Sequence, residues 1–174
     1  MRNVFWLRDG VIAGRSGPNR DAWNPVELAA SGIGAVLSVN DGELVHPADL
    51  RTAGIEHACI PLSDAAPPQP GDLDICVQAL PIALSFELSS IETGRGDLVH
   101  CSAGKDRTGM FLSYYLCAAE GLAPATAIEH VKRVRPIALS ADGWEPFTLD
   151  VLRALARRSA SRGGTRTLNG GAEE

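Results

Sequence analysis

One stretch of the chain decides both its fold and its chemistry, and it reads Val99-His100-Cys101-Ser102-Ala103-Gly104-Lys105-Asp106-Arg107-Thr108-Gly109. Residues 97–101 predict a short central strand, and the glycine at 104 predicts a tight turn over 102–105. A helix is expected to follow from about residue 107. This arrangement places a cysteine at the end of a strand and an arginine at the start of a helix, with five residues between them.

Such a turn is suited to binding and attacking a phosphate group. Successive backbone N–H groups in a turn of this kind point inward at an oxyanion, and the following helix adds the positive end of its dipole. Both effects favour the thiolate form of Cys101, which is the nucleophilic form. Arg107 has a planar fork that can hold two phosphate oxygens at once. Gly104 permits the turn, and the Thr108 hydroxyl lies close enough in sequence to stabilise the thiolate as a leaving group.

These residues resemble the H-C-x5-R-[S/T] signature of the cysteine-dependent protein tyrosine phosphatase superfamily, and the order of elements over about residues 4–156 is similar to its compact dual-specificity branch. The resemblance implies that Cys101 is the nucleophile, that Arg107 clamps the phosphate and that His100 orients the loop and tunes the thiol. It also implies that the phosphate cradle consists of the N–H groups of Ser102, Ala103, Gly104, Lys105, Asp106 and Arg107. The Lys105-Asp106 pair is similar to that of bacterial tyrosine phosphatase-like enzymes, some of which also accept phosphoinositides.

The resemblance further implies a general acid, an aspartate on a mobile loop that follows the strand before the long helix. Ile60-Pro61-Leu62-Ser63-Asp64 matches that arrangement, so Asp64 is the candidate. As a carboxylic acid it would protonate the leaving oxygen, and as a carboxylate it would then activate water. Asp72, which we interpret mainly as a helix cap, and Asp106 remain the alternatives.

The rest of the chain alternates short β-rich runs with helical patterns, which predicts a single α/β domain with a central, mainly parallel sheet flanked by helices. A long helix is expected from Asp72 to about Ile91, bent or broken at Pro81. The last helix is expected from about Glu145 to Arg158, with Trp144 as a packing residue. We therefore predict a phosphatase domain over residues 1–158 and a disordered polar tail over residues 159–174.

Composition excludes several classes of protein. The chain has 174 residues, of which 45% are hydrophobic and 21% charged, which is typical of one globular domain. Its net charge of −5 argues against a dedicated nucleic-acid binder.

The four cysteines form no C-x-x-C pair and no zinc pattern, so we expect reduced thiols, no metal and no cofactor. No signal peptide is evident, and the longest weakly charged run, residues 75–86, is shorter than the about 20 residues of a membrane span. These features predict a soluble, cytoplasmic protein without an integral membrane segment.

The sequence therefore predicts a metal-independent phosphomonoester hydrolase that works through a phosphocysteine intermediate. The expected substrate is phosphotyrosine in protein, with phosphoserine and phosphothreonine as further candidates. Lys105 motivates an alternative, a phosphoinositide or inositol phosphate, because a positive charge beside the cradle favours a polyanionic headgroup. Two other classes remain open: a catalytically silent phosphate-binding module and a rhodanese-like sulfurtransferase. The sequence carries no prediction of oligomeric state.

Overall fold

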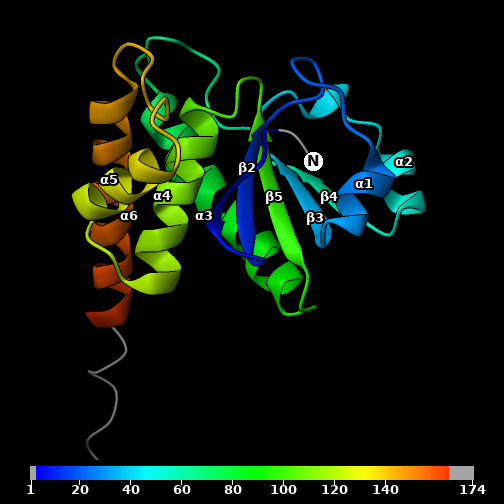
Figure 1. Ribbon diagram of the computed structural model, residues 1–174. Coiled ribbons are helices and arrows are strands. Elements are labelled where there is room, and N and C mark those ends of the chain that lie inside the picture. The colour runs from blue at the N-terminus through cyan, green and yellow to red at the C-terminus, as the bar shows by residue number, and fades with distance from the viewer. Residues whose placement is uncertain (1–2, 165–174) are drawn as a thin grey trace, which may run out of the picture.

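A five-stranded sheet forms the centre of the protein, whose computed structural model describes residues 3–164 (Figure 1). The strand order is β1-β2-β5-β3-β4. β1 pairs antiparallel with β2, and the other neighbours pair in parallel. The predicted α/β fold with a mainly parallel sheet is thus confirmed. The strands are β1 (Phe5–Arg8), β2 (Ile12–Ser16), β3 (Ile33–Ser38), β4 (Glu56–Cys59) and β5 (Gly96–Cys101).

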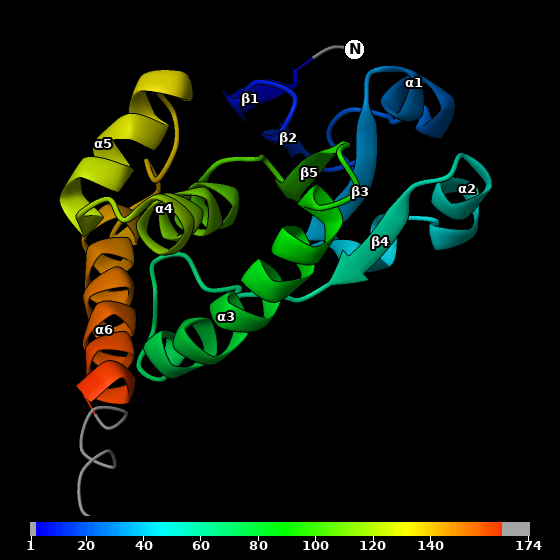
Figure 2. The same cartoon turned by 90° about the horizontal axis from the view of Figure 1, so that it is seen from below.

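Helices cover both faces of this sheet (Figure 2). Alternation along the central strand β5 explains why both faces need cover, because successive side chains point to opposite sides. Val99 and Cys101 belong to a large core, whereas Leu98 belongs to a smaller one. The large core lies beneath α3 (Asp72–Ile91), α4 (Asp106–Glu120), α5 (Pro124–Val134) and α6 (Trp144–Gly164), and the smaller one beneath α1 (Pro25–Ala30) and α2 (Pro47–Thr52).

Local sequence explains where several helices begin and end. α1, α2 and α5 each have proline at the first helical position, where the missing N–H costs nothing. The Asn24 side chain caps α1 by accepting hydrogen bonds from the N–H groups of Val26 at 3.0 Å and Glu27 at 3.3 Å. Gly121 ends α4 in a left-handed conformation.

Three local predictions differ from the structure. α6 continues to Gly164, so the domain boundary expected at residue 158 falls inside a helix; the last part of the predicted tail, 165–174, lies outside the described residues. α3 is continuous through Pro81, so the helix is not broken there, and Leu80 and Ala83 near the proline are buried in the core. Asp72 is the first residue of α3 and not its cap, and its carboxylate accepts a hydrogen bond from the Gln69 N–H at 2.6 Å. A short 3₁₀ helix, η1 (Gly42–Leu44), was not predicted.

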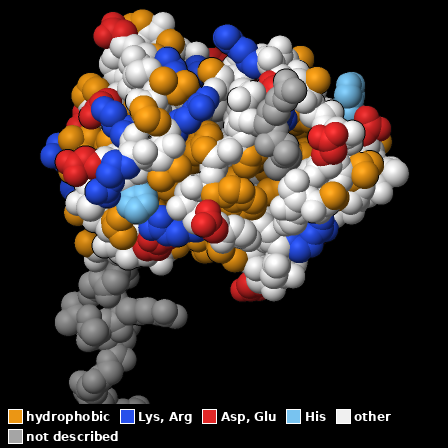
Figure 3. Space-filling view, viewed as in Figure 1, with side chains coloured by type: hydrophobic (Ala, Val, Ile, Leu, Met, Phe, Trp, Pro, Cys, Tyr) orange, Lys and Arg blue, Asp and Glu red, His pale blue; other side chains and the backbone are white. Residues whose placement is uncertain are grey.

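By length and composition alone, α3 is the one helix in residues 3–164 that could cross a membrane. In the fold it packs on the sheet through buried side chains that include Cys76, Val77 and Leu80. Charged side chains of both signs are interspersed with hydrophobic ones on the face shown in Figure 3.

Candidate active site

The predicted phosphate loop lies at the carboxyl end of β5, the edge at which open parallel sheets bind ligands. Cys101 is the last residue of β5 and only 2% exposed. Thr108, in the first turn of α4, is fully buried, and its hydroxyl donates a hydrogen bond to the Cys101 sulfur over 3.2 Å. A hydroxyl donor in this position stabilises negative charge on sulfur.

The loop between Cys101 and α4 packs against the end of β2 and the segment that follows it. Gly104 has a φ of +59°, and a Cβ there would lie 2.4 Å from the carbonyl carbon and oxygen of Arg15, so the position requires glycine on both counts. The Ser102 carbonyl accepts a hydrogen bond from the Gly17 N–H at 2.9 Å, and its hydroxyl accepts one from the Asn19 amide at 3.0 Å. These contacts fix the backbone of the predicted cradle.

Arg107 connects the loop to two other parts of the chain. Its Nε donates to the Ser63 carbonyl at 2.6 Å, and one terminal nitrogen donates to the Asp64 carbonyl. Its guanidinium carbon lies 4.9 Å from the centre of the Trp144 ring, which is fully buried. Trp144 is a packing residue, as expected, but its packing partner is the predicted phosphate clamp. The sequence offered no signal for that pairing.

Asp64 lies at the rim of the site, on the segment between β4 and α3. Its side chain is exposed, while the neighbouring Ser63 is buried. The hydrogen bond from Arg107 to its backbone carbonyl brings Asp64 next to the loop that carries Cys101. The same segment packs closely on the turn before α6, because a Cβ on Gly143 would lie 3.2 Å from the Pro68 side chain.

The two alternative acids are engaged elsewhere. The Asp72 carboxylate bonds to the Gln69 backbone, and the Asp106 carboxylate accepts a hydrogen bond from the Ala141 N–H at 3.1 Å. Asp106 is therefore a positioning residue that fastens the segment before α6 to the phosphate loop. Lys105 lies 3.5 Å from Asp106, and its side chain is one-quarter exposed. Ala103, between them and Cys101, is half-buried.

His100 lies on the opposite face of the sheet from Cys101 and is fully buried. Its Nε2 lies 2.6 Å from the Ser38 hydroxyl, and its ring makes an edge contact with Trp23. Burial lowers the pKa of His100 to about 4, so the ring is neutral at physiological pH. Ser38 was not among the predicted site residues, although a polar residue in the apolar run 35–39 was a signal that could have identified it.

No group of three or more His, Cys, Asp or Glu side chains that could hold a metal ion occurs within the part of the chain that the structure describes. All four cysteines are free thiols. The site contains a buried, hydroxyl-bonded sulfur at the start of the phosphate loop, an arginine at the end of that loop, and an exposed carboxyl group on the segment to which the arginine is hydrogen-bonded.

Comparison with known proteins agrees with this geometry. Residues 1–164 match the family model described as PTP-SAK: Swiss Army Knife protein, DSP-PTPase phosphatase domain. The chain is 32% identical over 111 residues to phosphatidylglycerophosphate phosphatase PTPMT2 of Arabidopsis thaliana, covering 63% of this chain and 46% of that protein. It is 31% identical over 122 residues to dual specificity protein phosphatase 12 of Rattus norvegicus, covering 70% and 34% respectively. The chain thus spans less than half the length of both relatives.

Solved structures share the fold. The crystal structure of Tk-PTP in its active form superposes with a TM-score of 0.71 at 23% identity, over 90% of this chain and 98% of that one. The match to the family model covers all of the described residues, from β1 to the end of α6, and so extends well beyond the phosphate loop. The protein belongs to the DSP-PTPase phosphatase domain family, and so to the dual-specificity phosphatase-like branch of the cysteine-dependent protein tyrosine phosphatases.

Proposed function

We propose that this protein hydrolyses phosphomonoesters through a phosphocysteine intermediate formed on Cys101. The observation that carries the proposal is the 3.2 Å hydrogen bond from the Thr108 hydroxyl to the Cys101 sulfur at the start of a helix. A structural thiol in an apolar core has no need of a buried hydroxyl donor, whereas a thiolate that alternately attacks and leaves is stabilised by one.

The reaction follows from the groups around the sulfur. The Cys101 thiolate attacks phosphorus, the phosphorus–oxygen ester bond breaks, and the leaving oxygen takes a proton from the Asp64 carboxylic acid. Water then attacks the phosphocysteine and gives its proton to the Asp64 carboxylate. The sulfur–phosphorus bond breaks, inorganic phosphate is released, and Thr108 stabilises the departing thiolate. Arg107 and the loop N–H groups hold the phosphoryl oxygens throughout.

Asp64 is the acid of this scheme because it is the exposed carboxyl group beside Arg107, while Asp72 and Asp106 are committed to backbone hydrogen bonds. Arg107 also makes the link between phosphate binding and the acid loop. A phosphate bound by the guanidinium competes with the Ser63 and Asp64 carbonyls for its hydrogen bonds. Substrate binding therefore changes the hydrogen bonds that hold the segment carrying the acid.

The substrate we propose is phosphotyrosine in protein, with phosphoserine and phosphothreonine as further substrates, in keeping with the dual-specificity relative. A second candidate is an anionic phospholipid or phosphoinositide. Three observations favour it: the partly exposed Lys105 beside the cradle, a relative that is a phosphatidylglycerophosphate phosphatase, and a structural neighbour, PTPMT1, solved in complex with PI(5)P at a TM-score of 0.68.

The primary test is hydrolysis of para-nitrophenyl phosphate by the wild-type protein, Cys101→Ser and Cys117→Ser. Cys117 is a free, partly buried cysteine on α4 and serves as the matched control. We expect turnover in the wild type and in Cys117→Ser and none in Cys101→Ser. Absence of turnover in the wild type, combined with binding of vanadate, would instead indicate a silent phosphate-binding module.

The substrate class is tested by comparing a phosphotyrosine peptide, a phosphothreonine peptide and phosphoinositide-containing vesicles. Lys105→Met is the informative variant, since it keeps the length of the side chain and removes its charge. If the lipid is the substrate, Lys105→Met reduces kcat/KM for the vesicles more than for para-nitrophenyl phosphate. Equal reductions for both substrates would exclude a headgroup contact at Lys105.

A further inference from the structure

Three polar side chains form a hydrogen-bonded chain across the sheet, on the face opposite Cys101. His57 lies on β4, Ser38 on β3 and His100 on β5. The Ser38 hydroxyl lies 2.8 Å from Nε2 of His57 and 2.6 Å from Nε2 of His100. The chain therefore leads from the edge strand of the sheet to the residue that precedes the proposed nucleophile.

We propose that His57 is a positioning residue of the active site: through the Ser38 hydroxyl it fixes which ring nitrogen of His100 carries the proton, and thereby the orientation of the Cys101 peptide group. The inference rests on the proposed role of Cys101 as nucleophile.

The direction in which hydrogen bonds are donated along His57, Ser38 and His100 follows from the number of protons available. The Ser38 hydroxyl has one proton, so it donates to one imidazole ring and accepts from the other. When His57 donates from Nε2, Ser38 must donate to Nε2 of His100, and His100 then carries its proton on Nδ1. In the opposite direction, His100 carries its proton on Nε2 and leaves Nδ1 as a bare lone pair.

The surroundings of His100, at the buried end of this hydrogen-bonded series, favour the direction that leaves the proton on Nδ1. Nδ1 of His100 is buried and makes no hydrogen bond of ordinary geometry within residues 3–164, but the ring interacts with the Cys101 backbone in a way that opposes the lowering of its pKa by burial. It borders the same small space as the Cys101 carbonyl oxygen, because a Cβ on Gly17 would lie 3.2 Å from the former and 3.0 Å from the latter. A carbonyl oxygen only accepts hydrogen bonds, so a proton on Nδ1 is attracted to it, whereas a lone pair on Nδ1 is repelled.

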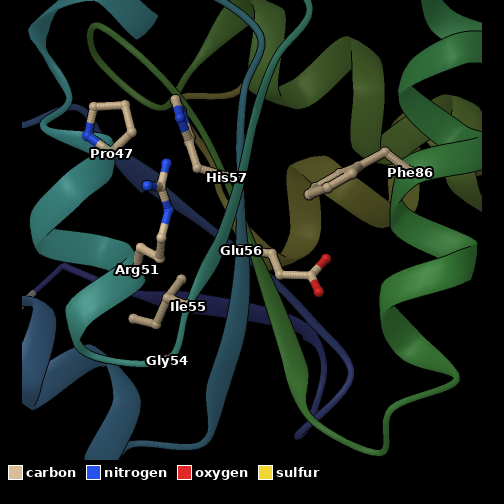
Figure 4. A pocket seen from close by; sticks show the side chains of 7 residues that line it. All are labelled: Pro47, Arg51, Gly54, Ile55, Glu56, His57 and Phe86. Atoms are coloured by element: carbon tan, nitrogen blue, oxygen red, sulfur yellow. The ribbon is translucent and has the colours of Figure 1, made fainter.

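His57, at the other end of the hydrogen-bonded series, is accessible to solvent. His57 is half-buried and borders a cavity of about 520 Å³ that is also lined by Arg51, Glu56 and Phe86. In Figure 4 the side chains of Arg51 and His57 lie close together, and Phe86 lies on the other side of β4. Burial lowers the pKa of His57, as it does that of His100. Both rings are then neutral at physiological pH, and it is the tautomer rather than the charge that the chain sets.

The consequence for catalysis concerns the first peptide of the loop. A proton on Nδ1 places the positive end of the imidazole dipole beside the Cys101 backbone and draws the carbonyl oxygen towards His100. That orientation keeps the negative end of the Cys101 peptide away from its own sulfur and leaves the N–H groups that follow free to converge on the phosphate. A mixture of tautomers weakens both effects.

The variants are His57→Phe, which keeps a ring but removes the donor, and His57→Gln, whose amide N–H can replace it. His46→Phe is the matched control, because His46 is an exposed imidazole at the start of α2 and caps it with no side-chain hydrogen bond. Two quantities are measured on the whole chain: the His100 tautomer, from ¹⁵N NMR of the ring nitrogens, and the pH at which iodoacetamide alkylates Cys101.

We expect His100 to carry its proton on Nδ1 in the wild type, in His57→Gln and in His46→Phe. In His57→Phe we expect a mixture of the Nδ1 and Nε2 tautomers. The alkylation midpoint of His57→Phe should rise by about 0.5 to 1 pH unit, a roughly three- to ten-fold loss of thiolate, as expected for one lost hydrogen bond. kcat/KM at about pH 6 should fall by the same factor and recover in His57→Gln.

The proposal is overturned if the wild type carries the His100 proton on Nε2, or if His57→Phe changes neither the tautomer nor the alkylation midpoint. Failure of the proposed function has a different signature. In that case Cys101→Ser retains full turnover, or the wild type has none, while the NMR measurement still reports the direction of the hydrogen-bond chain.

Discussion

A buried pair of carboxyl groups at the other end of β5 makes the stability of this protein depend on pH in a direction that can be worked out from the structure. Glu87 on α3 and Asp97 on β5 are both fully buried. Asp97 accepts a hydrogen bond from the Ser90 hydroxyl at 2.7 Å, and no other donor in the described chain reaches its second oxygen or either oxygen of Glu87, so the two carboxyl groups have only each other as further partners. Burial raises the pKa of Asp97 to about 6 and that of Glu87 well above its usual value.

Whether stability rises or falls with pH depends on which state, folded or unfolded, binds more protons. Between about pH 4 and pH 6 the folded state holds the Asp97 proton that the unfolded state has lost, so the free energy of unfolding falls as pH rises; the raised pKa of Glu87 acts in the same direction. Raising the pKa of Asp97 from 3.8 to about 6 corresponds to about 3 kcal/mol lost at neutral pH. His100 acts in the opposite sense, because its lowered pKa makes stability fall as pH drops from about 6.5 to about 4. The contribution of Glu87 and Asp97 to the pH dependence of stability is therefore measured as the difference between the wild type and a variant of the pair.

The variant is Glu87→Gln, whose amide can donate to Asp97 and removes one acid from the pair. Relative to the wild type, we expect it to be more stable by at least about 1 kcal/mol at about pH 7.5, because one unit of raised pKa already corresponds to about 1.4 kcal/mol, and close to the wild type at about pH 4.5, where Glu87 keeps its proton. Urea unfolding at both pH values measures the difference. Glu92→Gln, at the exposed end of the same helix, is the control and should differ little from the wild type at either pH. A Glu87→Gln effect that is the same at both pH values, or that is destabilising at the higher one, would refute the reasoning.

Three further outcomes are expected at the active site. Trp144→Leu should weaken inhibition by inorganic phosphate about 5- to 30-fold through loss of the ring beneath Arg107, whereas Trp144→Phe should retain most of it; equal loss in both variants would assign the effect to packing alone. Thr108→Ala should slow breakdown of the phosphocysteine about ten-fold and produce a burst of product in rapid-mixing kinetics, with recovery in Thr108→Ser; a steady rate without a burst would argue against its contact with the Cys101 sulfur in catalysis. Asp64→Ala should reduce kcat about 10²–10⁴-fold, while Asp74→Ala, on the exposed first turn of α3, should not; the reverse pattern would place the acid elsewhere.

Much of this fold was readable from local sequence. The alternation of strands and helices and the turn at Gly104 depend on the backbone preferences of a few adjacent residues. The end of α6 was misjudged for a related reason: residues 159–164 are small and polar, which indicates a tail, yet they extend a helix already anchored by Val151, Leu152 and Leu155. Likewise Pro81 is tolerated within α3 because packing on the sheet outweighs the one lost hydrogen bond.

By itself, the sequence determined the identity and order of the groups on the phosphate loop, since Cys101, Arg107 and Thr108 lie within one strand, turn and helix whose geometry is set locally. Only the tertiary structure decided what surrounds them: the Trp144 ring under Arg107, the Asp64 carbonyl on its guanidinium, and the chain from His57 through Ser38 to His100. Those partners come from distant segments of the chain. Their meeting depends on how the strands order themselves in the sheet and how the helices pack on it, which no short stretch of residues specifies.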